Sequence, residues 1–205
     1  MSAERIAGDM GNCHVLMLGN SFTSANDMPS LLAEATGVAV VAHVRGGARL
    51  AEHLNPATSN GKKTGALLER RWPDIVVMQE MSTGPITSPL RFSESVGQLC
   101  EACRSAGAAP VLFATWAFRD DCPRLEKLGL SRAEMHAALH EAYAAAAREN
   151  GAVLADVGTA FFQAQEPDLL YRADGMHPSR LGTELCVQTI SDALETVHLT
   201  RCVRE

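Results

Sequence analysis

Residues 14–21 have the sequence His-Val-Leu-Met-Leu-Gly-Asn-Ser. The apolar run 14–18 is short and stops at Gly19, a pattern that indicates a buried strand followed by a turn. A helix is expected soon afterwards, over 27–36, with Asn26 or Asp27 as its N-cap. The chain therefore opens with a strand–turn–helix unit.

The same unit recurs along the chain. Further apolar runs typical of buried strands cover 38–44, 75–78, 111–115 and 152–155. Helical patterns cover 64–71, 93–106, 131–150 and 179–197, and Ser131 with Glu134 has capping-box spacing. This alternation predicts an α/β fold: a three-layer α/β/α sandwich with a five-stranded parallel sheet, flavodoxin-like in type. No linker is evident, so we expect one domain over 1–205 with its core at about 14–197.

Composition excludes several classes of protein. With 46% hydrophobic residues and a net charge of -6, the chain is neither disordered nor suited to nucleic acid, which requires clustered basic residues. No run approaches the roughly 18 apolar residues of a membrane span. Residues 1–12 lack the basic and apolar segments of a signal peptide, so we expect a cytoplasmic protein.

The cysteines and histidines do not predict a metal or cofactor site. The pair Cys100 and Cys103 lies within a helical pattern and has no second pair near it, and His136 and His140 have no obvious third ligand. We interpret His43, His53 and His198 as structural. In a reducing compartment, most of the six cysteines are expected to be free thiols that are buried as small apolar side chains: Cys13, Cys100, Cys103, Cys122, Cys186 and Cys202.

In an open parallel sheet, ligands bind beyond the carboxyl ends of the strands. The residues at these ends are Gly19-Asn20-Ser21, Gly46-Gly47, Gln79-Glu80, Trp116 and Asp156. Ser21 has three interpretations at this stage: a simple helix cap, part of an anion cradle, or a nucleophile beside its own oxyanion donor.

A second polar group lies in the sequence Asp174-Gly-Met-His-Pro-Ser179, before the last helix. Asp174 precedes His177 by three residues, so one turn can present both side chains to the same site. A carboxylate can fix the tautomer of an imidazole that acts as a base. The alternative is a capping aspartate beside a surface histidine.

The order Ser21, Asp174, His177 resembles the SGNH hydrolase superfamily of GDSL-like esterases and lipases. The matching blocks are Gly-Asn-Ser-Phe at 19–22, Gly-Gly at 46–47, Gln-Glu at 79–80, Thr-Trp-Ala at 115–117 and Asp-Gly-Met-His-Pro-Ser at 174–179. The usual Gly-x-Asn-Asp block is absent, and the pattern is typical of a less characterised SGNH-like branch. The resemblance spans about residues 14 to 197.

The resemblance implies a serine hydrolase fold and mechanism. Ser21 would attack an ester carbonyl, His177 would act as the general base, and Asp174 would orient it. The oxyanion would bind the backbone N–H groups of Ser21 and of Gly47, which register favours over Gly46, together with the side-chain amide of Gln79.

The substrate is expected to be an ester of a small acyl group such as acetyl, with a carbohydrate as a candidate alcohol, because no long apolar lid is evident. Asn20, Glu80 and Trp116 are candidate substrate-binding residues. Glu80 could equally be a capping carboxylate, and Trp116 could equally be a core aromatic. Two other functions stay open: a catalytically weakened module that binds a small ligand or sugar, and an anion-binding flavodoxin-like domain.

Overall fold

The computed structural model describes residues 12–202, in which the apolar runs form one parallel sheet. The strands are β1 (His14–Gly19), β2 (Ala39–Val44), β3 (Ile75–Met78), β4 (Ala109–Phe113) and β5 (Val153–Ala155). Their order is β2-β1-β3-β4-β5, and every neighbouring pair is parallel. The predicted five-stranded parallel sheet is confirmed. The strand order reverses beside β1, and such a switch point is where open α/β sheets bind ligands.

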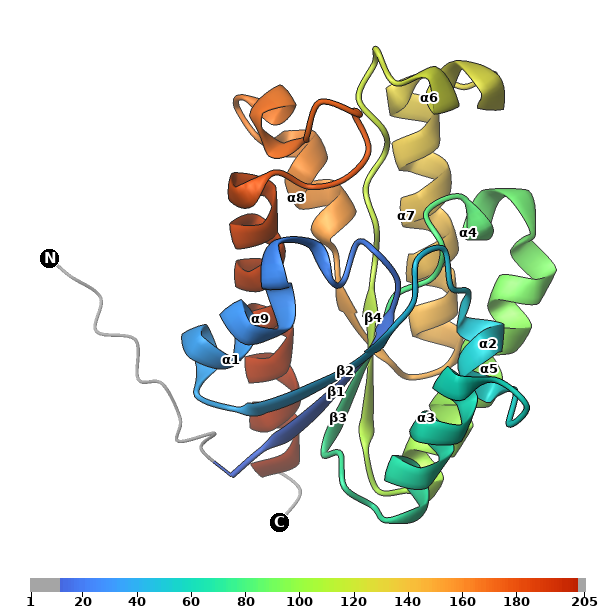
Figure 1. Ribbon diagram of the computed structural model, residues 1–205, viewed down its shortest axis with the longest axis vertical. Coiled ribbons are helices and arrows are strands. Elements are labelled where there is room, and N and C mark those ends of the chain that lie inside the picture. Colours follow the sequence, from blue (N-terminus) through green and yellow to red (C-terminus); the bar gives the residue numbers. More distant parts are fainter. Residues whose placement is uncertain (1–11, 203–205) are drawn as a thin grey trace, which may run out of the picture.

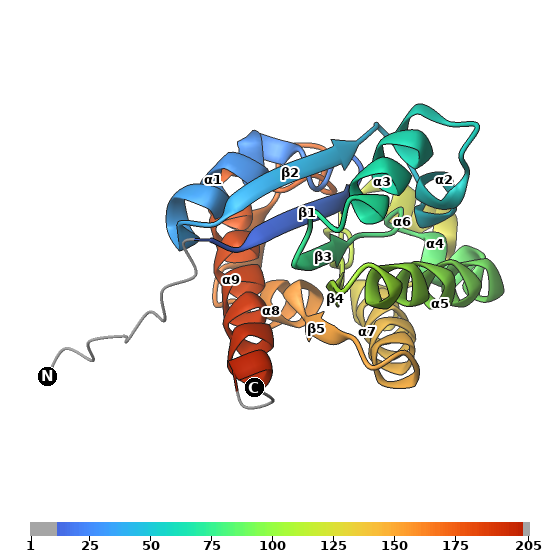
Figure 2. The same ribbon diagram turned by 90° about the horizontal axis from the view of Figure 1, so that it is seen from below.

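Helices cover both faces of the sheet (Figures 1 and 2). On one face lie α1 (Met28–Thr36), α8 (Val157–Gln163) and α9 (Arg180–Cys202). On the other face lie α2 (Leu50–Leu54), α3 (Ser59–Glu69), α5 (Pro89–Ser105) and α7 (Arg132–Glu149). The remaining helical segments belong to the connections: η1 (Ala25–Asp27), α4 (Gly84–Thr87), α6 (Pro123–Leu128) and η2 (Pro167–Leu170).

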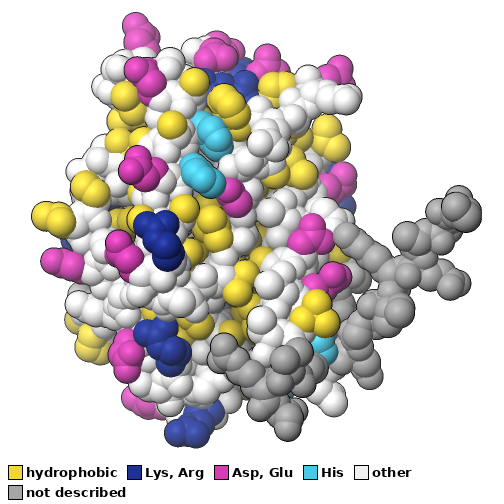
Figure 3. Space-filling view, turned by 180° about the vertical axis from the view of Figure 1, so that it is seen from behind, with side chains coloured by type: hydrophobic (Ala, Val, Ile, Leu, Met, Phe, Trp, Pro, Cys, Tyr) yellow, Lys and Arg dark blue, Asp and Glu magenta, His cyan; other side chains and the backbone are white. Residues whose placement is uncertain are grey.

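The core lies between the sheet and its two helical layers. The inner strands β1, β3 and β4 are almost completely buried, whereas β2, at one edge, is only half buried. Near-continuous apolar runs are what two covered faces require. On the rear face of the molecule, acidic and basic side chains are scattered among apolar ones (Figure 3). No helix within residues 12–202 has the length and apolar character that crossing a membrane requires.

Two predictions about helix caps have different outcomes. Ser131 and Glu134 form the expected capping box at the start of α7. The N-cap of α1 is Asp27, one of the two residues predicted for it, but Asp27 has a left-handed backbone and makes no side-chain cap hydrogen bond. The Asn26 side chain points elsewhere, toward the loop that carries His177.

Four cysteines are buried and unoxidised, as expected: Cys100, Cys103, Cys122 and Cys186. Burial raises the pKa of Cys100 to about 11 and that of Cys103 to about 12. Because the thiolate is the reactive form, these thiols pack as small apolar groups and are poor nucleophiles. The side chain of Cys202 lies outside the described part of the chain.

Candidate active site

Ser21 lies directly beyond the carboxyl end of β1, on a tight turn. Gly19 makes this turn possible, since a Cβ atom there would lie 2.2 Å from Thr23 Oγ1 and 2.8 Å from Gln79 Oε1. The turn continues as a hydrogen-bonded coil, in which the N–H of Ser24 donates to Asn20 O at 3.1 Å. Ser21 is therefore held, partly exposed, where the strand order reverses.

The structure brings Ser21, His177 and Asp174 together in one hydrogen-bonded line. Ser21 Oγ lies 3.0 Å from His177 Nε2, although the two residues are 156 positions apart in the chain. On the other side of the ring, His177 Nδ1 lies 2.6 Å from Asp174 Oδ2. With its proton on Nδ1 bonded to the carboxylate, the imidazole presents an unprotonated Nε2 to the hydroxyl. This is the arrangement in which a serine can be deprotonated.

Asp174 and His177 belong to the segment 171–178, which we call the histidine loop. Gly175 has φ 67, and a Cβ atom there would lie 3.0 Å from Cys122 Cβ, so a glycine is required. The second carboxylate oxygen, Asp174 Oδ1, accepts hydrogen bonds from the N–H groups of Met176 at 3.0 Å and His177 at 2.9 Å. Because Asp174 and His177 are only three residues apart, the Asp174 carboxylate can hydrogen-bond both the backbone and the ring of the histidine, which fixes the shape of the loop.

The Asp174 carboxylate is held in its ionised form. Partial burial opposes ionisation, but the hydrogen bonds from the His177 ring and from two backbone N–H groups outweigh it and lower the pKa of Asp174. The side chain of Asp174 is 45% exposed and that of His177 is 24% exposed. The site is therefore open to water on the carboxylate side.

A stack of aromatic rings packs against the His177 ring. Phe22 packs edge-on against the His177 ring with centroids 5.3 Å apart, and Trp116 stacks on Phe22 at 4.7 Å. Phe161 stacks on the far side of Trp116 at 4.3 Å. Trp116 Nε1 donates to Met176 O at 3.0 Å, so the indole also binds the histidine loop.

This position corrects the expectation that Trp116 lines a substrate pocket. The Trp116 side chain is completely buried, and its one polar atom is used to hold the histidine loop. Of the two interpretations open from the sequence, the core aromatic is correct.

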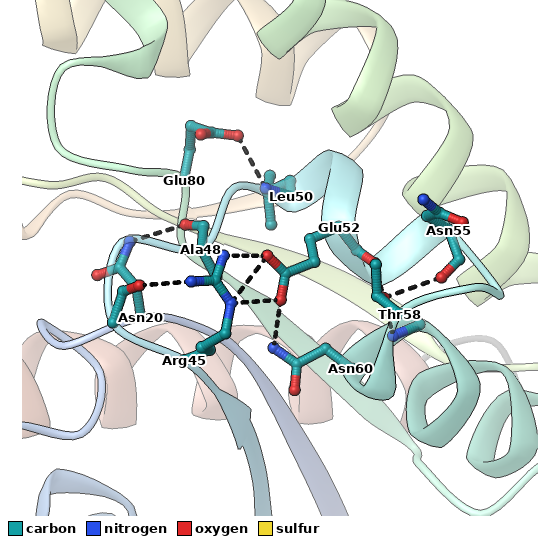
Figure 4. Close-up of polar contacts among 11 residues, drawn as sticks. Asn20, Arg45, Ala48, Leu50, Glu52, Asn55, Thr58, Asn60 and Glu80 are labelled. Atoms are coloured by element: carbon teal, nitrogen blue, oxygen red, sulfur yellow. Dashed lines mark hydrogen bonds and ion pairs between the residues drawn. The ribbon is translucent and has the colours of Figure 1, made fainter.

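Two backbone N–H groups are unpaired in the loops that follow β1 and β2. Among the described residues, the N–H of Ser21 and the N–H of Gly47 have no hydrogen-bond acceptor. Gly47 lies in an exposed turn and has φ 69, a conformation that favours glycine. Asn20, the residue before Ser21, connects its own loop to the turn that carries Gly47, because Asn20 Nδ2 donates a hydrogen bond to Ala48 O at 3.1 Å (Figure 4).

The side-chain amides near the site are turned inward. Gln79 Oε1 accepts from the N–H of Asn20 at 3.1 Å and from Thr23 Oγ1 at 2.9 Å, while Gln79 Nε2 donates to Glu80 O. Both Gln79 and Asn20 are buried. This geometry corrects the expectation that Gln79 donates to the oxyanion and that Asn20 binds substrate: both amides shape the turn on which Ser21 lies.

Glu80 is a buried capping carboxylate. Its Oε2 accepts from the N–H of Leu50 at 3.0 Å, at the start of α2 (Figure 4). Its Oε1 accepts from the N–H of Met81 at 2.8 Å. Burial raises the pKa of Glu80, although these hydrogen bonds oppose the shift. The expectation that Glu80 binds substrate is corrected in favour of the capping interpretation.

A second polar cluster, which the sequence did not predict, fixes the turn that carries Gly47. The Arg45 guanidinium pairs with the carboxylate of Glu52, and Asn60 Nδ2 donates to Glu52 Oε1 at 3.1 Å (Figure 4). Arg45 also donates to Gly46 O at 3.0 Å. Arg45 directly follows β2, whereas Glu52 lies in α2 and Asn60 in α3, and no local sequence pattern connects them.

Three further histidines have partners other than Ser21. His53 is buried, its Nδ1 lies 3.5 Å from Thr64 Oγ1, and burial lowers its pKa to about 4. His136 stacks on Phe162, and His140 Nδ1 lies 2.8 Å from Asp156 Oδ2. Within residues 12–202, no three side chains of His, Cys, Asp or Glu are grouped so that they could hold a metal ion.

Known structures resemble this fold closely. A putative SGNH hydrolase from Slackia heliotrinireducens is 49% identical, with a TM-score of 0.86 over 89% of this chain and 99% of that chain. A lipase/acylhydrolase from Enterococcus faecalis is 18% identical, with a TM-score of 0.67 over 90% of this chain and 96% of that chain. A variant of an acetyl-xylooligosaccharide esterase from Geobacillus Stearmophilus is 13% identical, with a TM-score of 0.67 over 91% and 96%.

The first of these relatives carries more information than the other two. At 49% identity over nearly the whole of both chains, it reports on family as well as fold. The other two similarities, below 25% identity, show the fold alone. No protein-family model and no curated protein matches the chain.

Proposed function

The chain belongs to the SGNH hydrolase family, and we propose that it is a serine esterase that cleaves esters of small acyl groups. The observation that carries this proposal is the line of two hydrogen bonds from Ser21 through His177 to Asp174. A structural serine has no need of an imidazole at 3.0 Å that is itself oriented by a carboxylate.

The first half of the reaction forms an acyl-enzyme. Ser21 Oγ attacks the ester carbonyl carbon while His177 Nε2 takes the hydroxyl proton, and the carbonyl oxygen becomes an oxyanion. The N–H groups of Ser21 and Gly47 stabilise this negative charge. The tetrahedral intermediate then collapses, the bond to the alkoxy oxygen breaks, and His177 returns its proton to the departing alcohol.

The second half returns the enzyme to its starting state. A water molecule gives a proton to His177 Nε2 as its oxygen attacks the acyl carbon of the Ser21 ester. The second tetrahedral intermediate releases the carboxylic acid, and the proton returns from His177 to Ser21 Oγ. Throughout both halves, the Asp174 carboxylate stays ionised and stabilises the imidazolium each time it forms.

A small acyl group, such as acetyl, fits the surroundings of Ser21. The aromatic rings nearest to the site, Phe22, Trp116 and Phe161, are at most 2% exposed and pack on one another. They therefore present no apolar channel for a long acyl chain. One relative of the same fold is an acetyl-xylooligosaccharide esterase, which makes an acetylated carbohydrate a reasonable class of substrate to test.

One observation favours a second candidate function, a module that binds a small ligand or sugar without turnover. Gln79 follows β3, where the family usually has the Gly-x-Asn-Asp block, and it is turned inward, which leaves two backbone N–H groups for the oxyanion. Losing one such donor typically lowers kcat by about 10²–10³-fold. A weakened enzyme and a binding module would therefore differ only in the reactivity of Ser21.

Turnover of activated and natural esters distinguishes the two functions. The purified chain is assayed with p-nitrophenyl acetate, p-nitrophenyl octanoate and an acetylated xylooligosaccharide, alongside Ser21→Ala and His177→Ala. We expect both variants to lose turnover while retaining their fold, and acetate to be preferred over octanoate. Wild-type activity in either variant would contradict the assigned roles, and preference for octanoate would contradict the small acyl group.

A further inference from the structure

Asn26 lies five residues after Ser21 and has an unusual backbone conformation. Its φ is 50 and its ψ is 30, and Asp27 follows with φ 58 and ψ 42. Side chains other than glycine rarely occupy this left-handed region, although asparagine and aspartate tolerate it best. Two such residues in succession persist only where the surroundings hold them, and such strain clusters at functional sites.

The contacts of the Asn26 side chain explain what holds it. Its Nδ2 lies 3.1 Å from Pro178 O, 3.0 Å from Ser179 O and 2.7 Å from Thr183 Oγ1. Its Oδ1 accepts a hydrogen bond from Arg172 at 2.7 Å. Both ends of the histidine loop and the first turn of α9 are thereby attached to one amide.

Arg172 extends this attachment to the catalytic histidine. Its backbone N–H donates to His177 O at 2.8 Å, and its carbonyl accepts from the N–H of Gly175 at 3.0 Å. Arg172 therefore hydrogen-bonds Asn26 through its side chain and the histidine loop through its backbone.

Asn26 is equally well attached to the nucleophile. The N–H of Ser24 donates to Asn20 O at 3.1 Å and the N–H of Ala25 donates to Phe22 O at 3.4 Å, which makes 20–26 a continuous coil. Within the described residues, the other hydrogen bond between this coil and the histidine loop is that between Ser21 and His177 themselves. Trp116 and Arg119, in the segment that follows β4, also hydrogen-bond the histidine loop, through Met176 O and Gly175 O.

We propose that Asn26 is a positioning residue that sets the separation between Ser21 Oγ and His177 Nε2. This inference rests on the proposed function, since it concerns the geometry of the same reaction. Asn26 touches no reacting atom and acts through the histidine loop. A displacement of about 1 Å between reacting groups lowers rates by up to roughly 10²-fold, so the loss of this link is expected to appear in kcat.

The test compares Asn26→Gly with a matched control, Asp27→Gly. Glycine adopts positive φ without strain, so both variants keep the backbone conformation. Asp27 is exposed and makes no side-chain cap hydrogen bond, whereas Asn26 loses all of its contacts to the histidine loop. We expect kcat for p-nitrophenyl acetate to fall by about 10²-fold in Asn26→Gly with KM little changed, and to stay near wild type in Asp27→Gly.

A second variant and a second readout separate positioning from folding. Asn26→Asp keeps the size of the side chain and an acceptor for Arg172 but removes the amide donor, and we expect kcat to fall in it as well. The rate of Ser21 modification by a fluorophosphonate should fall in parallel, while cooperative unfolding is retained. A merely structural role would lower the melting temperature and leave kcat of the folded enzyme unchanged.

The outcomes of this experiment are distinguishable. Wild-type kcat in a folded Asn26→Gly or Asn26→Asp, or equal losses in the two glycine variants, would overturn the inference. A wild-type chain that neither hydrolyses the ester nor reacts with the fluorophosphonate would overturn the proposed function, and this inference with it.

Discussion

Replacing Asp174 with asparagine is the substitution that best isolates how the site works. In Asp174→Asn, the amide oxygen can still accept the N–H groups of Met176 and His177, which lie 3.0 and 2.9 Å from Asp174 Oδ1. The histidine loop should therefore keep its shape. What changes is the group 2.6 Å from His177 Nδ1, which becomes an NH₂ donor in place of a carboxylate oxygen.

An amide donor at that position favours the wrong tautomer. His177 Nδ1 must then be unprotonated to accept the hydrogen bond, so the ring proton moves to Nε2, which faces Ser21 Oγ at 3.0 Å. A protonated Nε2 cannot take the serine proton. In serine hydrolases with this arrangement, the same change lowers kcat by about 10⁴-fold, which corresponds to a rise of about 5 kcal/mol in the activation barrier.

The assay measures kcat and KM for p-nitrophenyl acetate, with Ser21→Ala setting the background rate. Asp192→Asn is the matched control, because it neutralises a carboxylate on α9 that hydrogen-bonds Gln188 and lies far along that helix from the histidine loop. We expect a large loss of kcat in Asp174→Asn, wild-type kinetics in Asp192→Asn and cooperative unfolding in both. Should Asp174→Asn keep a tenth or more of the wild-type kcat, the tautomer argument would be refuted and a Ser21–His177 dyad would suffice.

Three further predictions concern residues outside the triad. Trp116→Phe keeps an aromatic ring in the stack but loses the hydrogen bond to Met176 O, so kcat should fall by roughly tenfold with KM unchanged. A kcat equal to that of the wild type would show that the indole N–H does not position the histidine loop. Burial lowers the pKa of His53 to about 4, so below about pH 6.5 this histidine is protonated in the unfolded chain before it is protonated in the folded one. The free energy of unfolding should therefore fall by roughly 3 kcal/mol as the pH falls from about 6.5 to 4. Urea titrations should show this loss in wild type and a shallower one in His53→Gln, and identical slopes would contradict it. Ser131→Ala removes the capping box of α7 and should lower the free energy of unfolding by about 1 kcal/mol without changing kcat, which urea titration and the ester assay check together.

The sheet could be predicted from the sequence because its strands are covered on both faces. Such strands are continuous apolar runs, and the five runs correspond to β1–β5 with small differences at their ends. The helices α2, α4, α6 and α8 were not predicted, since they have only 5, 4, 6 and 7 residues. A segment of this length is too short to show helical periodicity.

The candidate site was predictable where its signals are local. Asp174 and His177 lie three residues apart on one turn, and Ser21 follows the first strand directly, so each could be recognised in its own stretch of sequence. The direction in which a side chain points after a strand is decided by packing from distant segments. Gln79 and Trp116 both follow strands, and both point inward because Asn20 and Met176 supply their partners.

The role of Asn26 could not be predicted from the sequence either. Its position before an expected helix favours a capping role, and nothing in the neighbouring sequence indicates that its amide reaches Pro178, 152 residues away. The left-handed backbone at 26–27 is equally invisible in the sequence. Long-range hydrogen bonds of this kind have no periodicity and become apparent only in the folded chain.

The most direct test of the central claim is whether Ser21 is an activated nucleophile. The folded chain is treated with a fluorophosphonate, and the modified residue is located by mass spectrometry of proteolytic peptides, with Ser21→Ala and Asp174→Asn treated in parallel. We expect a single adduct on Ser21, absent from Ser21→Ala and formed far more slowly in Asp174→Asn. A folded wild-type chain that forms no adduct, or one that is modified on a different serine, would contradict it.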